Sequence, residues 1–136
     1  MIEKNRPINA IGYARVSTTE QGKGTSNDTQ YESIMKFCLE RNIVLKKMFV
    51  EECSGANFED RPSFNKAYKY LSDNKGEIDL FLCFRVDRFT RDTESGLIMT
   101  SKLKKLGVIV NYVEDYVEDA SSPSGSFMTN MKMVFA

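Results

Sequence analysis

The strongest strand signal in the chain is Ile78-Asp79-Leu80-Phe81-Leu82-Cys83-Phe84, which runs directly into Arg85-Val86-Asp87-Arg88-Phe89-Thr90-Arg91. The first of these segments is short and almost continuously apolar, as is typical of a buried strand. Three other short apolar segments have a similar character, and we predict that they are strands as well. They cover residues 8–14, 43–50 and 108–113.

Between these segments the apolar residues follow a helical period. A first helix is predicted from Thr29 and a second from Pro62, because four apolar residues in each recur at the i, i+3, i+4, i+7 spacing of one buried helix face. A third helix is predicted from about residue 92 to residue 106, before Gly107. Strands that alternate with helices predict an α/β domain with a mostly parallel sheet. The positions with helical spacing are Tyr31, Ile34, Met35 and Cys38, and then Phe64, Ala67, Tyr68 and Leu71.

The length and composition exclude several classes of protein. A chain of 136 residues suits one compact domain. It contains no histidine, which excludes Ser-His-Asp triads, Cys-His pairs and histidine-ligated metal sites. Nothing else in the sequence requires a metal, and we expect no cofactor. No apolar run approaches the ~20 residues of a membrane span, and the N-terminus lacks the apolar core of a signal peptide.

The cysteines and the net charge further narrow the class of protein to which the chain could belong. Cys38, Cys53 and Cys83 are odd in number and have no C-x-x-C spacing. We therefore interpret them as reduced core residues of a cytoplasmic protein. The 19 basic side chains are balanced by 19 acidic ones, so the domain is expected to bind DNA poorly without sequence specificity.

The last segment carries an apolar stripe. Ser122 and Pro123 are a plausible N-cap and first helical residue, and the chain reaches Ala136 while the helix is still apolar. We expect part of this helix to pack on its own sheet and the stripe to support self-association. We also expect the helix to be truncated. The stripe consists of Phe127, Met128, Met131, Val134 and Phe135.

Polar side chains with possible chemistry follow the first and third strands. In a parallel sheet the carboxyl ends of the strands meet at one edge, where ligands bind. Each of these residues has an alternative explanation: Ser17 as a loop or cap serine, Asp87 and Arg91 as a surface i, i+4 pair, and Arg61 as a solvated side chain. Their joint placement instead favours an anion site. The group comprises Arg15, Ser17, Arg61, Asp87, Arg88 and Arg91.

A phosphodiester fits this group better than an acyl substrate does. Attack by serine on an acyl carbon normally needs a base such as histidine, and the chain has none. Phosphoryl transfer depends largely on positioned cations, because negative charge spreads over the phosphoryl oxygens in the transition state. Arginine supplies a permanent charge and a bidentate fork for phosphate.

Four motifs resemble those of the serine recombinases, the resolvase/invertase family that includes the large serine integrases. The similarity spans residues 8–136, with the motifs in the family's order, and the length of the loop between Gln21 and Gln30 resembles the large members. The motifs are Tyr13-Ala14-Arg15-Val16-Ser17-Thr18 followed by Gln21, Ser54-Gly55 followed by Asp60-Arg61-Pro62, Asp87-Arg88-Phe89-Thr90-Arg91, and Gly125-Ser126-Phe127.

The resemblance implies a fold and a domain division. The fold would be a three-layer domain with a four- or five-stranded sheet flanked by helices. Residues 1–121 would form the catalytic domain, and residues 122–136 would begin a long dimerisation helix that is cut before a DNA-binding region. A bacterial or phage origin is implied, as are a homodimer and a tetrameric synaptic complex on DNA.

The resemblance also implies residue roles. Ser17 would attack a DNA phosphodiester to give a 5′-phosphoserine, and Asp87 would orient the arginines or take part in proton transfer. Tyr13, Gln21 and Gln30 match polar active-site positions of the family. The arginines implied to bind the scissile phosphate are Arg15, Arg61, Arg88 and Arg91.

Three alternatives stay open from the sequence. A non-catalytic dimerisation module would not need Ser17 together with four arginines. A nucleotide-binding α/β domain lacks support, because no glycine-rich phosphate loop follows the first strand. A serine-dependent phosphodiesterase that hydrolyses DNA without rejoining it would use the same residues.

Overall fold

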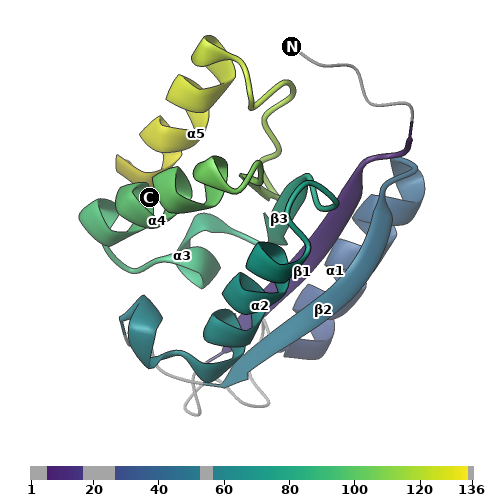
Figure 1. Ribbon diagram of the computed structural model, residues 1–136, viewed down its shortest axis with the longest axis horizontal. Coiled ribbons are helices and arrows are strands. Elements are labelled where there is room, and N and C mark those ends of the chain that lie inside the picture. The colour runs from purple at the N-terminus through teal and green to yellow at the C-terminus, as the bar shows by residue number, and fades with distance from the viewer. Residues whose placement is uncertain (1–5, 17–26, 53–56, 135–136) are drawn as a thin grey trace.

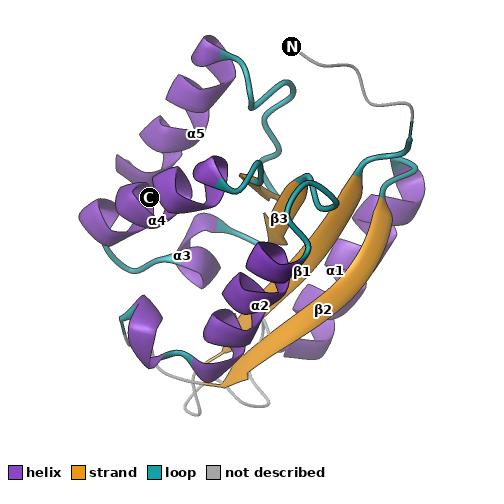
Figure 2. Cartoon of the chain, viewed as in Figure 1, coloured by secondary structure: helices purple, strands orange, loops and turns teal. Residues whose placement is uncertain are grey.

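The computed structural model describes residues 6–16, 27–52 and 57–134. A four-stranded sheet with the order β2-β1-β3-β4 lies at its centre, and every neighbouring pair of strands is parallel (Figure 2). The predicted α/β class with a mostly parallel sheet is therefore confirmed. The strands are β1 (Asn9–Val16), β2 (Val44–Glu52), β3 (Leu80–Cys83) and β4 (Ile109–Tyr112).

Helices cover both faces of the sheet, which gives the three predicted layers. Helix α1 lies on one side of β1 and β2, and α2 lies on the other side (Figure 1). The α1 face is closed by Ile34, Phe37 and Cys38, which pack in one cluster with residues of β1 and β3. The helices of the described residues are α1 (Asn27–Glu40), α2 (Pro62–Asp73), α3 (Val86–Phe89), α4 (Thr93–Lys105) and α5 (Pro123–Val134), with a short 3-10 turn at Phe58–Asp60.

The opposite face holds the larger core, which is rich in aromatic rings. Phe81 of β3 is fully buried and lies 5.6 Å from the Tyr13 ring, 5.9 Å from the Phe64 ring and 5.8 Å from the Phe89 ring, measured between centroids. Such tilted and edge-on pairs add to the free energy that burial of apolar area already contributes. This core joins β1, β3, α2 and α3, so it fixes the elements that carry the polar residues described below.

Two of the cysteines lie where the sequence predicts them. Cys38 and Cys83 are buried free thiols, whereas Cys53 lies outside the described residues. Burial raises the pKa of the Cys38 thiol to about 11 and also raises the pKa of Cys83. Since the thiolate is the reactive form, both side chains serve as small apolar core residues.

Two strands extend further than their apolar segments predict. β1 continues past Ala14 to Val16, and β2 continues past Val50 to Glu52. The parallel ladder pairs Arg15 with Glu51, so main-chain hydrogen bonds extend both strands beyond their apolar segments into polar residues. This extension places two charged side chains at the carboxyl edge of the sheet.

The alternative explanation of Asp87 and Arg91 as a surface helical pair is wrong, because the two residues are not part of one helix. Helix α3 ends at Phe89, and Thr90 has extended backbone angles of φ −142° and ψ 151°. Asp92 then caps α4 by accepting a 2.8 Å hydrogen bond from the Ser95 main-chain N–H. The i, i+4 geometry that such a pair requires is therefore absent from residues 86–92 of the described structure.

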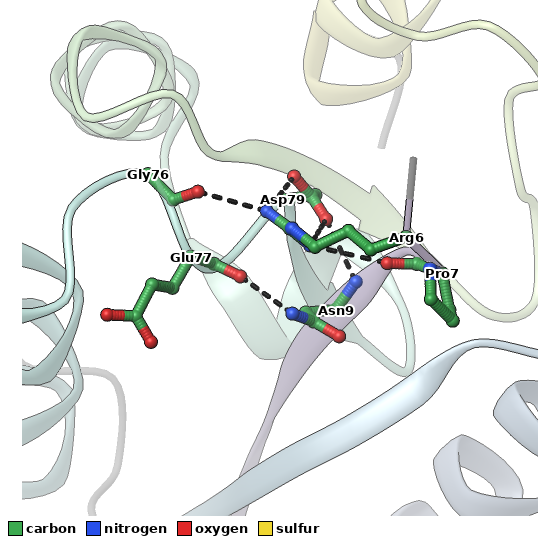
Figure 3. Close-up of polar contacts among 6 residues, drawn as sticks. All are labelled: Arg6, Pro7, Asn9, Gly76, Glu77 and Asp79. Carbon is green, nitrogen blue, oxygen red and sulfur yellow. Dashed lines mark hydrogen bonds and ion pairs between the residues drawn. The ribbon is translucent and has the colours of Figure 1, made fainter. Parts of the chain in front are cut away.

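A polar cluster at the opposite edge of the sheet fixes the amino end of β1 (Figure 3). The Asp79 carboxylate accepts hydrogen bonds from Arg6 Nη1 at 2.8 Å and from the Asn9 main-chain N–H at 2.9 Å. The Asn9 side chain donates to the Glu77 carbonyl, and Arg6 Nη2 donates to the Gly76 carbonyl, both at 2.9 Å. These bonds join the start of β1 to the loop that precedes β3.

We expect Asp79→Ala to lower the free energy of unfolding by about 2 kcal/mol, because the change removes bonds to a largely buried carboxylate. Asp73→Ala is the matched control. Asp73 is 59% exposed and forms a surface ion pair with Lys69, so its loss should cost less than about 0.5 kcal/mol. Urea denaturation of the two variants measures the difference, and equal losses would contradict the assignment.

Candidate active site

Arg15 brings the end of β1 against α3. Its side chain is 4% exposed, and the guanidinium donates from Nη2 to the Asp87 carbonyl at 2.5 Å and from Nε to the Arg88 carbonyl at 3.2 Å. The last carbonyls of a helix have no intrahelical partner and carry partial negative charge. The carbonyl groups at the end of the short helix α3 therefore provide hydrogen-bond acceptors for a buried cation.

Arg61 reaches the same helix from another element. It lies directly before Pro62, the first residue of α2, and is 2% exposed. Its Nη1 donates to the Phe89 carbonyl at 2.6 Å, and its guanidinium carbon lies 4.3 Å from the centroid of the Phe58 ring. A ring face that attracts the cation and a carbonyl that accepts a hydrogen bond from it together hold this side chain in one place.

The Asp87–Arg91 motif contributes one buried arginine and an exposed carboxylate. Arg88 is 8% exposed, and its Nε lies 4.0 Å from Asp87 Oδ1. The Asp87 side chain is 59% exposed and also lies 3.4 Å from Arg85 Nε. Arg91 is exposed and follows the end of α3. The structure therefore brings Arg15, Arg61 and Arg88 together at α3, with Asp87 at the rim.

Gln30 is fully buried and holds the end of β1 in place. Its Oε1 accepts from the Arg15 main-chain N–H and its Nε2 donates to the Arg15 carbonyl, both at 3.1 Å. A side-chain amide that binds both the N–H and the C=O of one residue forms the same pair of hydrogen bonds that a neighbouring strand would form. Gln30 thus fixes the backbone of Arg15, and a direct role in binding substrate stays a prediction.

Tyr13 is also fully buried. Its hydroxyl donates a 2.8 Å hydrogen bond to Glu51 Oε1. Burial raises the pKa of this hydroxyl far above its usual value, while the nearby Arg61 lowers it and Glu51 raises it. Tyr13 therefore stays protonated near neutral pH, and its hydroxyl acts as a hydrogen-bond donor inside the core.

The remaining predicted polar residues lie outside the described structure. Ser17 and Gln21 both fall between residue 16 and residue 27, beyond the described ranges. Ser17 is the next residue of the chain after β1. Within the described ranges, no three His, Cys, Asp or Glu side chains gather as a metal site would require.

Comparison with known sequences decides the family. The profile of the family described as "Resolvase, N terminal domain" matches residues 10–136, which is nearly the whole chain. The chain belongs to this resolvase family. The predicted resemblance to the resolvase/invertase family is thereby confirmed.

Individual relatives agree with this assignment. The resolvase-family chain is 31% identical over 121 residues to a Bacillus subtilis (strain 168) protein named "Putative DNA recombinase", and it spans 23% of that protein. It is 27% identical over 129 residues to the Tn552 resolvase of Staphylococcus aureus, and it spans 57% of that protein. The matched region therefore covers well under two thirds of either relative.

Solved structures of low sequence identity share the fold. The N-terminal catalytic domain of TP901-1 integrase superimposes with a TM-score of 0.76 at 18% identity, over 93% of this chain and 92% of that one. A resolvase family site-specific recombinase from Streptococcus pneumoniae gives a TM-score of 0.74 at 23% identity, over 94% of this chain and 87% of that one. The resolvase-like fold prediction is confirmed.

Helix α5 of this resolvase-family chain has one packed face and one exposed face. Gly125, Thr129 and Met133 are buried, and a Cβ atom at Gly125 would collide with the Asp119 carbonyl oxygen. The predicted stripe lies on the other face. Phe127, Met128 and Val134 are 60%, 51% and 47% exposed, Met131 is half-buried, and Phe135 lies outside the described residues.

A cleft of about 720 Å³ is lined by residues of both α3 and α5. Asp87 lines it from α3, Tyr112 from β4, and Met128 and Met131 from α5. Two residues of the predicted interface stripe therefore line the same cleft as the rim carboxylate of the candidate site.

Among the described residues, no helix is both long and apolar enough to cross a membrane.

Sequence reasoning missed Glu51. The apolar segment predicts a strand that ends at Val50, so the acidic residues beyond it receive no role. The signal that could have found Glu51 is its position across the parallel ladder from Arg15, because residues that pair in register near the carboxyl edge lie beside the same site. The Glu51 side chain is only 2% exposed.

Proposed function

We propose that this chain is the catalytic domain of a serine site-specific DNA recombinase, with Ser17 as the nucleophile. The observation that carries the proposal is the convergence of Arg15 and Arg61 on the four-residue helix that carries Arg88, at the carboxyl edge of a parallel sheet. Guanidinium groups stay charged at every physiological pH, and their planar forks match phosphate oxygens. Family membership supports the same interpretation.

In the proposed reaction, the Ser17 oxygen attacks the phosphorus of a DNA phosphodiester. The new bond joins this oxygen to phosphorus, the bond from phosphorus to the 3′ oxygen breaks, and the serine proton leaves as the 3′ oxygen gains one. Negative charge grows on the phosphoryl oxygens in the transition state, where Arg15, Arg61, Arg88 and Arg91 would stabilise it. Asp87 would orient these arginines or take part in transferring the proton to the 3′ oxygen.

Rejoining is the same step in reverse. The phosphoserine ester stores the energy of the broken phosphodiester, so a 3′ hydroxyl from either partner strand can attack it without ATP. Because the cations in the proposed reaction are arginine side chains of the protein, no metal ion enters the proposed steps.

DNA and further copies of the protein are the proposed partners. We assign the catalytic role to residues 1–121 and the start of a dimerisation helix to residues 122–136, with a homodimer that pairs into a tetramer on DNA. The exposed side chains Phe127, Met128 and Val134 support this surface for self-association. Because the net charge of the chain is zero, we expect the chain alone to bind DNA weakly.

The test is covalent capture of DNA by the full-length protein. The protein is incubated with its supercoiled target DNA in EDTA and quenched with denaturant, and the DNA ends are analysed. We expect protein attached to 5′ ends and free hydroxyl groups at 3′ ends. Attachment to 3′ ends, or cleavage that requires an added divalent metal, would overturn the proposal.

A further inference from the structure

A groove of about 390 Å³ lies between α2 and α4, and we call it the α2–α4 groove. Its apolar lining comes from both helices and from the 3-10 turn at Phe58–Asp60. Phe58 and Phe64 are 5% and 1% exposed, whereas Tyr68, Met99 and Leu106 are half-buried and pack against the edge of the core. Half-buried apolar side chains around one hollow provide area that a partner's side chain can cover.

Two lysines of α4 line the same groove. Lys102 and Lys105 are exposed, and their i, i+3 spacing places them on one face of the helix. Neither of them forms an ion pair with any residue that the structure describes. Their ammonium groups are therefore available to carboxylates that a partner brings.

The dipole of α4 does not by itself explain the position of this pair. Cations stabilise the last turn of a helix, and Lys104 supplies one there as well. Lys104 is exposed, but it does not line the groove. Lys102 and Lys105 differ from Lys104 because they lie beside an apolar hollow. A ligand that combines an apolar side chain with carboxylates would use both features.

The opposite wall makes the groove asymmetric. Glu59 and Asn65 line this wall, and Asn65 Nδ2 donates to the Glu59 carbonyl at 3.0 Å. The Glu59 carboxylate adds a negative charge on the side that faces away from the lysines of α4. Carboxylates of a ligand are therefore favoured on the α4 side of the groove and disfavoured on the other side.

Nucleic acid suits this groove less well than an acidic peptide does. Proteins hold DNA through many cations along the phosphates, and they hold single strands by stacking bases on exposed ring faces. The Phe58 and Phe64 rings are buried, and the Arg61 guanidinium carbon lies 4.3 Å from the Phe58 centroid. Glu59 would repel phosphates as well. The groove thus offers a hollow for one side chain instead of a stacking platform.

A second copy of the chain is also a poor occupant. Its acidic segment at residues 114–119 would be the natural match for the lysines. In the structure Asp115 already pairs with Lys132 at 2.5 Å, and Glu118 pairs with Arg41 at 2.6 Å. The segment would have to lose both ion pairs in order to bind. The acidic segment of a different protein has no such cost.

We propose that the α2–α4 groove binds an acidic peptide segment of another protein. One apolar side chain of the segment occupies the groove, and neighbouring carboxylates pair with Lys102 and Lys105. This interaction goes beyond the proposed function and does not depend on it. The bound segment would contact the Phe58 ring, which also holds Arg61 of the candidate site.

Fluorescence anisotropy with labelled peptides tests this binding. The probes are three peptides Asp-Glu-Asp-X-Glu-Asp-Glu in which X is Phe, Leu or Met, and the matched control has Ala at X. We expect at least one probe to bind saturably with a Kd below about 100 μM in 0.15 M salt. The alanine peptide should bind roughly 10-fold more weakly, because it leaves the apolar lining uncovered.

Charge reversal on α4 tests the place of binding. Lys102→Glu and Lys105→Glu should each weaken the best probe roughly 5-fold, because a like charge then faces its carboxylates. Lys104→Glu is the matched control on the same helical turn, and it should change the Kd by less than about 2-fold, since salt screens a charge outside the groove. All three residues are exposed, so the variants are expected to fold.

Four outcomes would overturn the proposal. They are no saturable binding of any probe, equal binding of the alanine peptide, equal weakening by all three charge reversals, and loss of self-association in Lys102→Glu but not in Lys104→Glu. The last outcome, measured by sedimentation, would assign the groove to a second copy. No DNA cleavage is measured in these experiments, so each of these results leaves the proposed function intact.

Discussion

Ser17→Ala is expected to abolish covalent attachment of the protein to DNA, with a rate at least about 1,000-fold below wild type. The alanine has no oxygen that could form the bond to phosphorus, and the proposed reaction uses no other hydroxyl group of the protein. Denaturing gels of DNA labelled at the 5′ end measure the attached protein directly. Binding of the variant to the same DNA should be unchanged, because the serine is not expected to contribute to affinity.

Ser101→Ala is the control for this experiment, since Ser101 is an exposed residue of α4. It should form the covalent complex at the wild-type rate. Attachment that persists in Ser17→Ala would assign the nucleophile to another residue. Cleavage without attachment in the variant would indicate hydrolysis by water instead of transfer to the protein.

Arg61→Ala is expected to slow covalent complex formation roughly 100- to 1,000-fold, the usual cost of removing one preorganised donor from a developing anion. The change removes the cation that reaches α3 from the start of α2. Arg61→Lys should recover only part of the rate, because an ammonium group keeps the charge but not the planar fork. Single-turnover rates at saturating DNA measure both variants.

Arg41→Ala provides the matched control. Arg41 also stacks on aromatic rings, 4.7 Å from the Phe37 centroid and 4.6 Å from that of Tyr116, and it pairs with Glu118 at 2.6 Å. It follows the end of α1, at the amino edge of the parallel sheet, so its loss should affect stability without slowing the reaction. Similar rate losses for Arg41→Ala and Arg61→Ala would show that loss of packing explains both.

Apolar periodicity predicts the elements of this fold well. Pro62 and the spacing of Phe64 and Leu71 place α2, and the apolar segment at residues 78–84 places β3. The rule that parallel strands end at one edge then correctly predicts that Arg15 and the Asp87 region meet. These inferences succeed because the burial of one helix face or one strand is a local pattern in the sequence.

The contacts within the site could not be predicted in the same way. Arg15 donates to carbonyls that lie 72 and 73 residues further along the chain, and no residue type marks a carbonyl as an acceptor. Gln30 likewise binds main-chain groups of Arg15, so its partner has no side-chain signature. Glu51 was missed for a related reason, because the ladder that aligns it with Arg15 continues beyond the apolar segment.

The wide separation of these partners also has a consequence for folding. β1 occupies an inner position of the sheet and pairs with β3, so the arginines and the carbonyls of α3 meet only after some seventy residues have been brought together. Pairings of such long range close late, because the entropy of a large loop is lost before the contact forms. A nascent or partly unfolded chain therefore contains the serine and the arginines, but the contacts that place the arginines at α3 have not yet formed. In the proposed enzyme, the contacts between Arg15 and α3 therefore form only together with the completed sheet.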